Sequence, residues 1–182
     1  MNLKKNFKLE NINLFFEEEM ILENINFSFD ITERIGIIGS TGSGKTTLAN
    51  IITGLEGISK GKIEKEDDYF IPLILQSTEK QFFEETVEKD LLFGPMNQKL
   101  SLEDSEIRIK NALELVGIDY EKYKDKSPFE LSGGEQRKIA IASILSMKYD
   151  FLVFDEPTVG LDNPGIKKLS LILEKMREQS RG

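Results

Sequence analysis

Apolar and polar residues alternate along the first part of the chain. Apolar side chains occupy every second position at 12–14 and again at 25–29. A strand places successive side chains on opposite faces, so this spacing predicts two antiparallel strands joined by a turn at 17–20. Two shorter stretches, 62–64 and 69–75, are predicted to add further strands.

The spacing changes to a helical one in the middle of the chain. Residues 84–126 are rich in charge, and one stretch within them repeats apolar residues three and four positions apart. This stretch predicts a helix that begins after Ser101, a good N-terminal cap, and ends at Gly117. Further helices are predicted to begin at Ser132 and to cover 164–177. The expected inner face of the first helix is formed by Ile109, Ala112, Leu113 and Val116.

Two short apolar runs, 35–38 and 151–154, predict buried strands. The first is followed by a glycine-rich loop and by an apolar helical stripe that Gly54 is expected to end. Together the elements predict an α/β fold with an antiparallel sheet at the front and a helical insert in the middle. No linker separates these parts, so 1–182 is predicted to be a single domain. The helical stripe after the loop consists of Leu48, Ile51, Ile52 and Leu55.

Composition narrows the class of protein. The chain has 182 residues, enough for a sizeable core, and a formal net charge of −8. This charge argues against general nucleic-acid binding, which needs Lys and Arg to neutralise phosphates. Cysteine is absent from the sequence, which excludes disulfides. We expect neither a membrane span, for which an apolar stretch of roughly 20 residues is needed, nor a signal peptide.

The glycine-rich loop carries the first recognisable chemistry. Gly39-Ser-Thr-Gly-Ser-Gly-Lys-Thr46 matches the pattern G-x-x-x-x-G-K-[ST] between a predicted strand and a predicted helix. Its glycines let backbone N–H groups approach a polyphosphate, Lys45 can reach the β/γ-phosphates, and the Thr46 hydroxyl can take a Mg²⁺ position. The pattern therefore predicts a nucleotide-binding loop. Its expected contacts are Gly39, Ser40, Thr41, Gly42, Ser43, Gly44, Lys45, Thr46 and Thr47.

Two further motifs supply acidic and glycine-rich groups. The run 151–154 delivers two carboxylates at a strand end, where Asp155 can hold Mg²⁺ and Glu156 can polarise a water molecule. On its own, this pattern is more often a strand end with solvated acids. Leu131-Ser-Gly-Gly-Glu135 opens a helix with free N–H groups, which predicts a second anion site or, equally well, a plain helix cap.

In combination, these motifs resemble those of the ATP-binding-cassette (ABC) transporter ATPases, from about residue 7 to the end of the chain. The family's order is kept by the phosphate loop, Gln76, Leu131-Ser-Gly-Gly-Glu-Gln-Arg137, Phe154-Asp-Glu-Pro157 and Val159-Gly-Leu-Asp162. The resemblance implies a P-loop NTPase core with an N-terminal antiparallel subdomain and an inserted helical subdomain. The implied parts are the sheet and phosphate loop at 1–75, the helical insert at 76–148, and the last strand and helix at 149–182.

The resemblance also implies roles for individual residues. Gln76 would contact Mg²⁺ and the attacking water, and would act with Glu156 in catalysis. Asp162 would cross the interface of a dimer, and an aromatic residue would stack on adenine, Phe16 by its spacing or Phe15 as the alternative. The γ-phosphate of ATP held by a second subunit would be bound by Leu131, Ser132, Gly133, Gly134 and Glu135. The implied cofactors are ATP and a Mg²⁺ ion held by Thr46, Gln76 and Asp155.

The segment after Gln76 narrows the resemblance to energy-coupling-factor ATPases, which drive importers of cobalt or vitamins. Ser77-Thr-Glu-Lys-Gln-Phe-Phe83 matches the family's frequent Asn-Pro-Glu-Asp-Gln-Leu-Phe in part. One of Phe82 and Phe83 is expected to line a groove for a coupling helix of a transmembrane partner, and the alternative is that both pack within an irregular loop. The implied assembly is a homo- or heterodimer of such ATPases, peripheral on the inner, cytoplasmic face of the cell membrane, with no nucleic-acid partner.

Two other functions stay open: a soluble ABC ATPase without a transport role, and a weakly or non-hydrolysing partner in a heterodimer. The sequence contains no histidine. The family places one on a strand that follows the last helix and lies between the strands at 35–38 and 151–154. We therefore expect the 182-residue chain to be truncated before that strand and to have little or no ATPase activity of its own.

Overall fold

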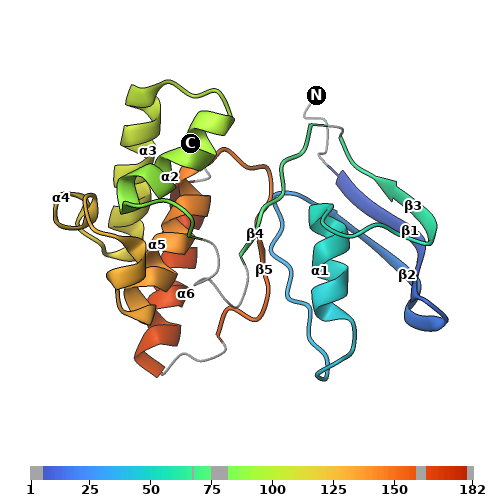
Figure 1. Ribbon diagram of the computed structural model, residues 1–182. Helices are drawn as coiled ribbons and strands as arrows, with labels where there is room; N and C mark the ends of the chain where they lie inside the picture. The colour runs from blue at the N-terminus through green and yellow to red at the C-terminus, as the bar shows by residue number, and fades with distance from the viewer. Residues whose placement is uncertain (1–5, 67, 75–81, 159–162, 180–182) are drawn as a thin grey trace. The chain divides into compact units, whose positions relative to one another are not determined.

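The computed structural model describes residues 6–66, 68–74, 82–158 and 163–179 (Figure 1). The chain divides into two compact units, each built from two separate stretches of sequence. The first unit is Met1–Leu73 with Tyr149–Asp155, and the second is Ile74–Lys148 with Glu156–Gly182. The organisation of 1–182 as a single domain stays a prediction.

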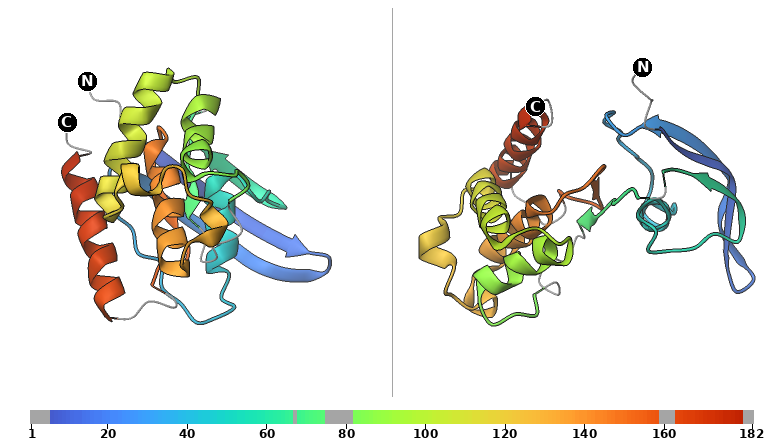
Figure 2. Two further views of the ribbon diagram at one scale, coloured as in Figure 1. Left: turned by 60° about the vertical axis from the view of Figure 1, so that its left-hand side comes forward. Right: turned by 90° about the horizontal axis from the view of Figure 1, so that it is seen from above.

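The first unit contains the antiparallel sheet that the alternating pattern predicts. Strand β1 (Asn6–Phe16) pairs with β2 (Glu19–Asp30) on one side and with β3 (Lys60–Glu64) on the other. The β1–β2 turn is tighter than expected, since β2 already begins at Glu19. Helix α1 (Lys45–Thr53) packs on the concave side of this sheet, which curves around it in the right-hand view of Figure 2.

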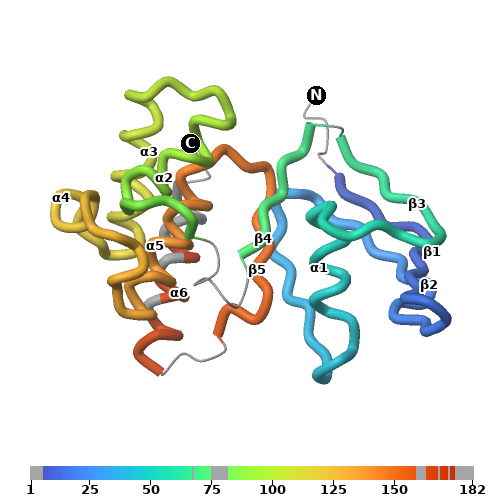
Figure 3. The backbone as a smooth tube through the Cα atoms, viewed as in Figure 1, coloured from blue at the N-terminus to red at the C-terminus, as the bar shows by residue number. Residues whose placement is uncertain are grey.

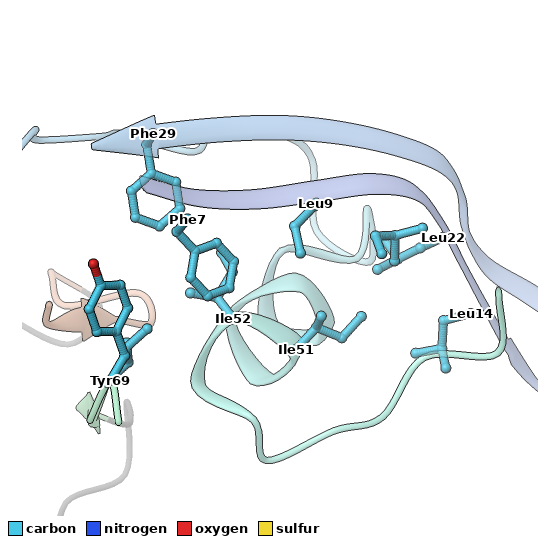
Figure 4. Close-up of a cluster of buried hydrophobic side chains, with 10 residues drawn as sticks. Phe7, Leu9, Leu14, Leu22, Phe29, Ile51, Ile52 and Tyr69 are labelled. Atoms are coloured by element: carbon cyan, nitrogen blue, oxygen red, sulfur yellow. The ribbon is translucent and has the colours of Figure 1, made fainter. Parts of the chain in front are cut away.

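Alternation along β1 produces the core of the first unit. Every second residue at the start of β1 is buried, and these side chains meet two isoleucines from α1 (Figure 4). Phe7 stacks on Phe29 of β2 with ring centroids 5.1 Å apart. Apolar burial of this kind is the main favourable term in folding, so the sheet and α1 stabilise each other. The core is formed by Phe7, Leu9, Ile12, Leu14, Leu22, Phe29, Ile51, Ile52, Tyr69 and Ile71.

The prediction of a buried strand at 35–38 is wrong. The backbone from β2 to α1 has no regular structure here (Figure 3), and the side chain of Ile38 is 94% exposed. A strand needs a neighbour for its N–H and C=O groups, and no strand in the described part of the chain pairs with this segment. The expectation that Leu55 belongs to the stripe of α1 is also wrong, because it follows the helix end at Gly54 and is exposed.

Two other predicted strands are much shorter than expected. Only β4 (Leu73–Ile74) forms within 69–75, and only β5 (Val153–Phe154) forms within 151–154, where it is half-buried. The two pair with each other in a separate two-stranded sheet. The Val153 amide also donates to the Pro72 carbonyl at 3.1 Å. Pro72 has no N–H to donate in return, which limits how far such a ladder extends.

The second unit is helical, as the charged middle of the chain predicts. Helices α2 and α3 pack against α5, and α3 also contacts α4 and α6. Ser101 caps α3 by accepting a hydrogen bond from the Asp104 amide, and Gly117 ends it with φ 70°, so both predicted boundaries are confirmed. The elements are α2 (Val87–Asn97), α3 (Leu102–Val116), α4 (Tyr120–Tyr123), a 3₁₀ turn η2 (Pro128–Glu130), α5 (Gly133–Ser146) and α6 (Asn163–Gln179).

The expectation that the chain contains no membrane span concerns the length and hydropathy of its helices. Within the described residues, none of the helices is both apolar enough and long enough to cross a bilayer.

Candidate functional site

The phosphate-binding loop predicted from the sequence leads directly into α1. Gly42 and Gly44 have φ of 80° and 86°, a conformation that other residues rarely adopt. Space is restricted at Gly44, where a Cβ atom would lie 2.7 Å from Leu22 Cδ2 and 3.4 Å from the Ile21 carbonyl oxygen. The glycine is therefore required both by backbone conformation and by the β2 strand packed behind the loop.

Lys45, the first residue of α1, folds its side chain back over the loop. Its ammonium donates hydrogen bonds to the carbonyl oxygens of Gly39 at 3.1 Å and Ser40 at 2.9 Å. The same donors can turn to a phosphate, which is a stronger, charged acceptor. The N-cap Gly44 has no side chain to cap the helix, so the N-terminal end of α1 faces the loop without a competing side-chain acceptor.

Thr46 and Asp155 meet although 109 positions separate them in the sequence. The Thr46 hydroxyl donates to Asp155, with Oγ1 2.9 Å from Oδ2 and 3.2 Å from Oδ1. A hydroxyl and a carboxylate are hard oxygen ligands of the kind that Mg²⁺ uses together with substrate phosphates. The described residues contain no group of three or more His, Cys, Asp or Glu side chains that could hold a metal ion. The Thr46–Asp155 pair offers two oxygen atoms, which fits Mg²⁺ that is also bound by phosphates and water.

Glu156, the predicted catalytic carboxylate, follows the end of β5 in an unusual backbone conformation. Its φ is 46°, in the left-handed region that costs a non-glycine residue free energy. Such outliers persist where the surrounding structure holds them, and they are concentrated at functional sites. Pro157, the next residue, is held by α5, because the Arg137 guanidinium donates a hydrogen bond to the Pro157 carbonyl oxygen.

The 131–135 segment is the predicted second anion site, and it forms the start of α5. Ser132 and Glu135 form a capping box. The Ser132 hydroxyl and amide donate to Glu135 Oε2 at 2.6 and 3.0 Å, and the Glu135 amide donates to Ser132 Oγ at 3.4 Å. In the described part of the chain, the amides of Gly133 and Gly134 have no hydrogen-bond partner. The helix cap and an open pair of donors are therefore present together.

Tyr123 lies beside this segment but belongs to none of the motifs recognised in the sequence. Tyr123, at the end of α4, donates its hydroxyl to Glu135 Oε1 at 2.6 Å. The hydrogen bond from the Ser132 hydroxyl, followed by the one from Tyr123, lowers the pKa of Glu135 to about 2. Tyr123 and Glu135 are 12 positions apart, and the path of the chain through η2 brings them together.

The aromatic candidates differ in burial. Phe82 is buried, at 7% exposure, whereas Phe83 is 56% exposed and packs edge-on against Phe93 with centroids 4.6 Å apart. The alternative that both pack inside a loop is therefore wrong for Phe83. The adenine candidates Phe15 and Phe16 lie at the end of β1, where Phe16 is exposed. Gln76 and Asp162, also expected in the site, lie outside the described residues.

Comparison with known proteins agrees with this arrangement of motifs. The ABC transporter family matches residues 22–159. The chain is 45% identical to the energy-coupling factor transporter ATP-binding protein EcfA2 of Caldanaerobacter subterraneus subsp. tengcongensis, over 94% of this chain and 65% of that protein. The chain thus spans less than two thirds of the length of this relative.

Solved structures show the same fold. The chain is similar to cbiO1 from Clostridium perfringens, part of the ABC transporter complex cbiONQ, with a TM-score of 0.81 and 32% identity over 95% of this chain and 74% of that one. It is also similar to the bacterial ABC transporter cassette MJ0796, solved as a dimer, with a TM-score of 0.80 and 27% identity over 96% and 84% of the two chains.

Proposed function

This chain belongs to the ABC transporter family, and we propose that it binds and hydrolyses MgATP as an ATPase subunit of an energy-coupling-factor importer. The contact between Thr46 and Asp155 carries the proposal, because it joins the phosphate loop to the acidic strand end. Neither motif alone provides a metal site. Together they provide two oxygen ligands next to a loop shaped for polyphosphate.

The residues divide the chemistry among them. Lys45 and the loop amides would bind the phosphates, while Thr46 and Asp155, which already contact each other, would hold Mg²⁺ together with Gln76. When bound, the ion would supply positive charge that offsets the charge developing on the transferred phosphoryl group. Glu156 orients the attacking water and accepts its proton. Phe16, or Phe15, stacks on adenine.

A second copy or a related subunit completes each nucleotide site. One chain carries two anion-binding elements, the phosphate loop and the 131–135 segment. In the proposed head-to-tail dimer, the 131–135 segment of one subunit binds the γ-phosphate held by the other, and Asp162 lies at the interface. The dimeric state of the similar cassette MJ0796 supports this arrangement.

The energy of ATP-driven closure is proposed to reach a transmembrane partner through Phe83. This ring is exposed and is held by Phe93, which gives an apolar anchor of the kind that coupling contacts use. Phe82 is buried and therefore does not offer its ring to such a contact. The subunit would therefore be peripheral on the inner face of the cell membrane, and the importer would be of the vitamin or metal type.

Two substitutions test the ATPase proposal. Lys45→Ala should weaken ATP affinity at least about tenfold in an equilibrium titration with a labelled ATP analogue, because it leaves phosphate charge unpaired. In a protein that also contains the expected histidine-bearing strand, Glu156→Gln should keep that affinity and slow turnover by roughly 10² or more. The matched control is Lys60→Ala, which removes an exposed lysine of β3. Unchanged affinity in Lys45→Ala would contradict the proposed phosphate site.

A fractionation experiment separates the transport role from the alternative of a soluble ABC ATPase. An importer subunit should co-purify with membrane fractions that contain its transmembrane partner. Recovery with ribosomes or DNA instead would favour the soluble alternative.

A further inference from the structure

We propose that Tyr123 is a positioning residue for the 131–135 segment: its hydroxyl holds the Glu135 carboxylate so that the Gly133 and Gly134 amides stay open to a phosphate. This inference rests on the proposed function, in which that segment binds the γ-phosphate of the partner subunit's ATP.

The hydrogen bonds around Glu135 form a chain from α4 to the start of α5. Tyr123 donates to Oε1 at 2.6 Å, while the Ser132 hydroxyl and amide donate to Oε2. Each carboxylate oxygen is thus fixed by a different element. With Tyr123 in place, the Glu135 side chain has one orientation in which all three donors are satisfied.

Charge makes this orientation matter. Glu135 is a carboxylate in the first turn of α5, where it stabilises the helix but would repel an approaching phosphate. The Tyr123 hydroxyl offsets part of this charge and draws Oε1 toward α4. Lys126 adds a positive charge beside Tyr123, with its ammonium 4.4 Å from the centroid of the Tyr123 ring. The negative charge is therefore compensated on the side of α4.

Tyr123 is buried in the second unit, and its hydroxyl remains a hydrogen-bond donor at neutral pH. Its side chain is buried, at 9% exposure. The hydrogen bond to Glu135 raises the pKa of Tyr123 above its ordinary value of 10.0, so the phenol keeps its proton. Tyr123→Phe removes only the hydroxyl and preserves the buried ring, so it separates the hydrogen bond from the packing.

Tyr120 provides a matched control on the same short helix. Its hydroxyl also donates to a carboxylate, that of Glu88 in α2. Tyr120→Phe therefore removes a similar hydrogen bond from α4 without changing the contacts of the 131–135 segment.

The first test measures ATP-driven dimerisation in a Glu156→Gln background by light scattering over a range of protein concentrations, with Mg²⁺ and ATP. We expect Tyr123→Phe to raise the dimer dissociation constant about threefold to tenfold, with ATP binding to the monomer unchanged within about twofold. Tyr120→Phe should change neither quantity. In a Glu135→Ala background Tyr123→Phe should have no further effect, since it acts through Glu135.

The second test uses hydrogen exchange of the monomer. The amides of Ser132 and Glu135, which are hydrogen-bonded in the capping box, should exchange faster in Tyr123→Phe than in the parent or in Tyr120→Phe. If Tyr123→Phe lowers only thermal stability and leaves dimerisation and exchange unchanged, the proposal is wrong. If the Glu156→Gln parent does not dimerise with ATP, the proposed function fails, and the exchange measurement alone then decides for or against the role of Tyr123.

Discussion

At the scale of single residues, carboxylates with fixed partners organise the chain at several places. The Asp155 carboxylate accepts a hydrogen bond from the Thr46 hydroxyl, and the Glu135 carboxylate accepts hydrogen bonds from the hydroxyls of Ser132 and Tyr123. Asp90 in α2 is a third case: its carboxylate is 4% exposed and accepts hydrogen bonds from the amides of Phe83 and Glu84 at 3.1 and 3.3 Å. Asp90 thereby fixes the backbone of the exposed aromatic anchor.

Asp90 leads to a prediction about pH. Burial raises the pKa of Asp90 above its ordinary value of 3.8, although the two backbone N–H groups act in the opposite direction. Because the folded-state pKa is the higher one, the free energy of unfolding falls as pH rises from the pKa of this carboxyl in the unfolded chain through its pKa in the folded protein. Asp90→Asn keeps an oxygen acceptor without the charge. The variant should therefore gain stability relative to the parent across this range and hold the gain at neutral pH.

Urea unfolding at a series of pH values from about 3 to about 7 measures this difference, since that range brackets the ordinary carboxylate pKa values. The Glu114→Gln variant is a suitable control for the loss of one acidic charge, since Glu114 is exposed in α3 and does not contribute to the pKa shift of Asp90. A difference between Asp90→Asn and the parent that is the same at every pH would contradict the prediction, since it would mean that folding does not change the pKa of Asp90.

At the scale of elements, the sheet of the first unit contains irregularities that alternation does not reveal. The β1–β2 register shifts near Asn11 and Asn24, whose φ values are 50° and 49°. The side chains of Asn26 and Asn13 replace part of the missing ladder: Asn26 Oδ1 accepts from the Asn11 amide, and Asn13 Oδ1 accepts from the Asn24 amide, both at 2.9 Å. Bulges of this kind bend a sheet, which fits its curvature around α1.

Gly61 in β3 faces the same irregular region and gives a prediction for the element. It has φ 110°, and a Cβ atom there would lie 2.6 Å from the carbonyl oxygens of both Glu10 and Asn11. These are backbone atoms that cannot turn aside. Gly61→Ala should therefore lower the free energy of unfolding by at least about 2 kcal/mol, as measured by denaturant titration.

The control for this substitution is Gly57→Ala. A Cβ atom at Gly57 would meet no heavy atom within 4 Å, and the backbone there does not have a positive φ. The control should change the free energy of unfolding by less than about 0.5 kcal/mol. Equal effects of the two substitutions would mean that the β1–β3 contact adapts to a side chain.

At the scale of the whole molecule, the proposed membrane partner depends on which of two adjacent aromatics is exposed. Phe83→Ala should weaken co-purification with the transmembrane component, by about 2 kcal/mol or more in affinity, and leave thermal stability nearly unchanged. Phe82→Ala removes a buried ring and should instead destabilise the protein by about 3–5 kcal/mol. Pull-down together with thermal melts distinguishes the two. Normal pull-down by Phe83→Ala would place the coupling contact elsewhere.

The sequence alone determined those features that depend on a few neighbouring residues. The N-terminal caps at Ser101 and Ser132 are confirmed because each serine hydroxyl accepts from the backbone amide three positions on, and the stop at Gly117 is confirmed by its φ of 70°. The phosphate loop was recognisable for the same reason, since its glycines and Lys45 act within eight residues.

Only the tertiary structure decided which segments pair and which side chains meet. The run at 35–38 has the composition of a buried strand, yet it has no ladder partner in the described residues, and Ile38 is exposed. The meeting of Tyr123 with Glu135 depends on the path of the chain between them, and that of Thr46 with Asp155 on the packing of distant elements. Local patterns fix backbone conformation and caps, but burial and pairing require partners that local sequence cannot specify.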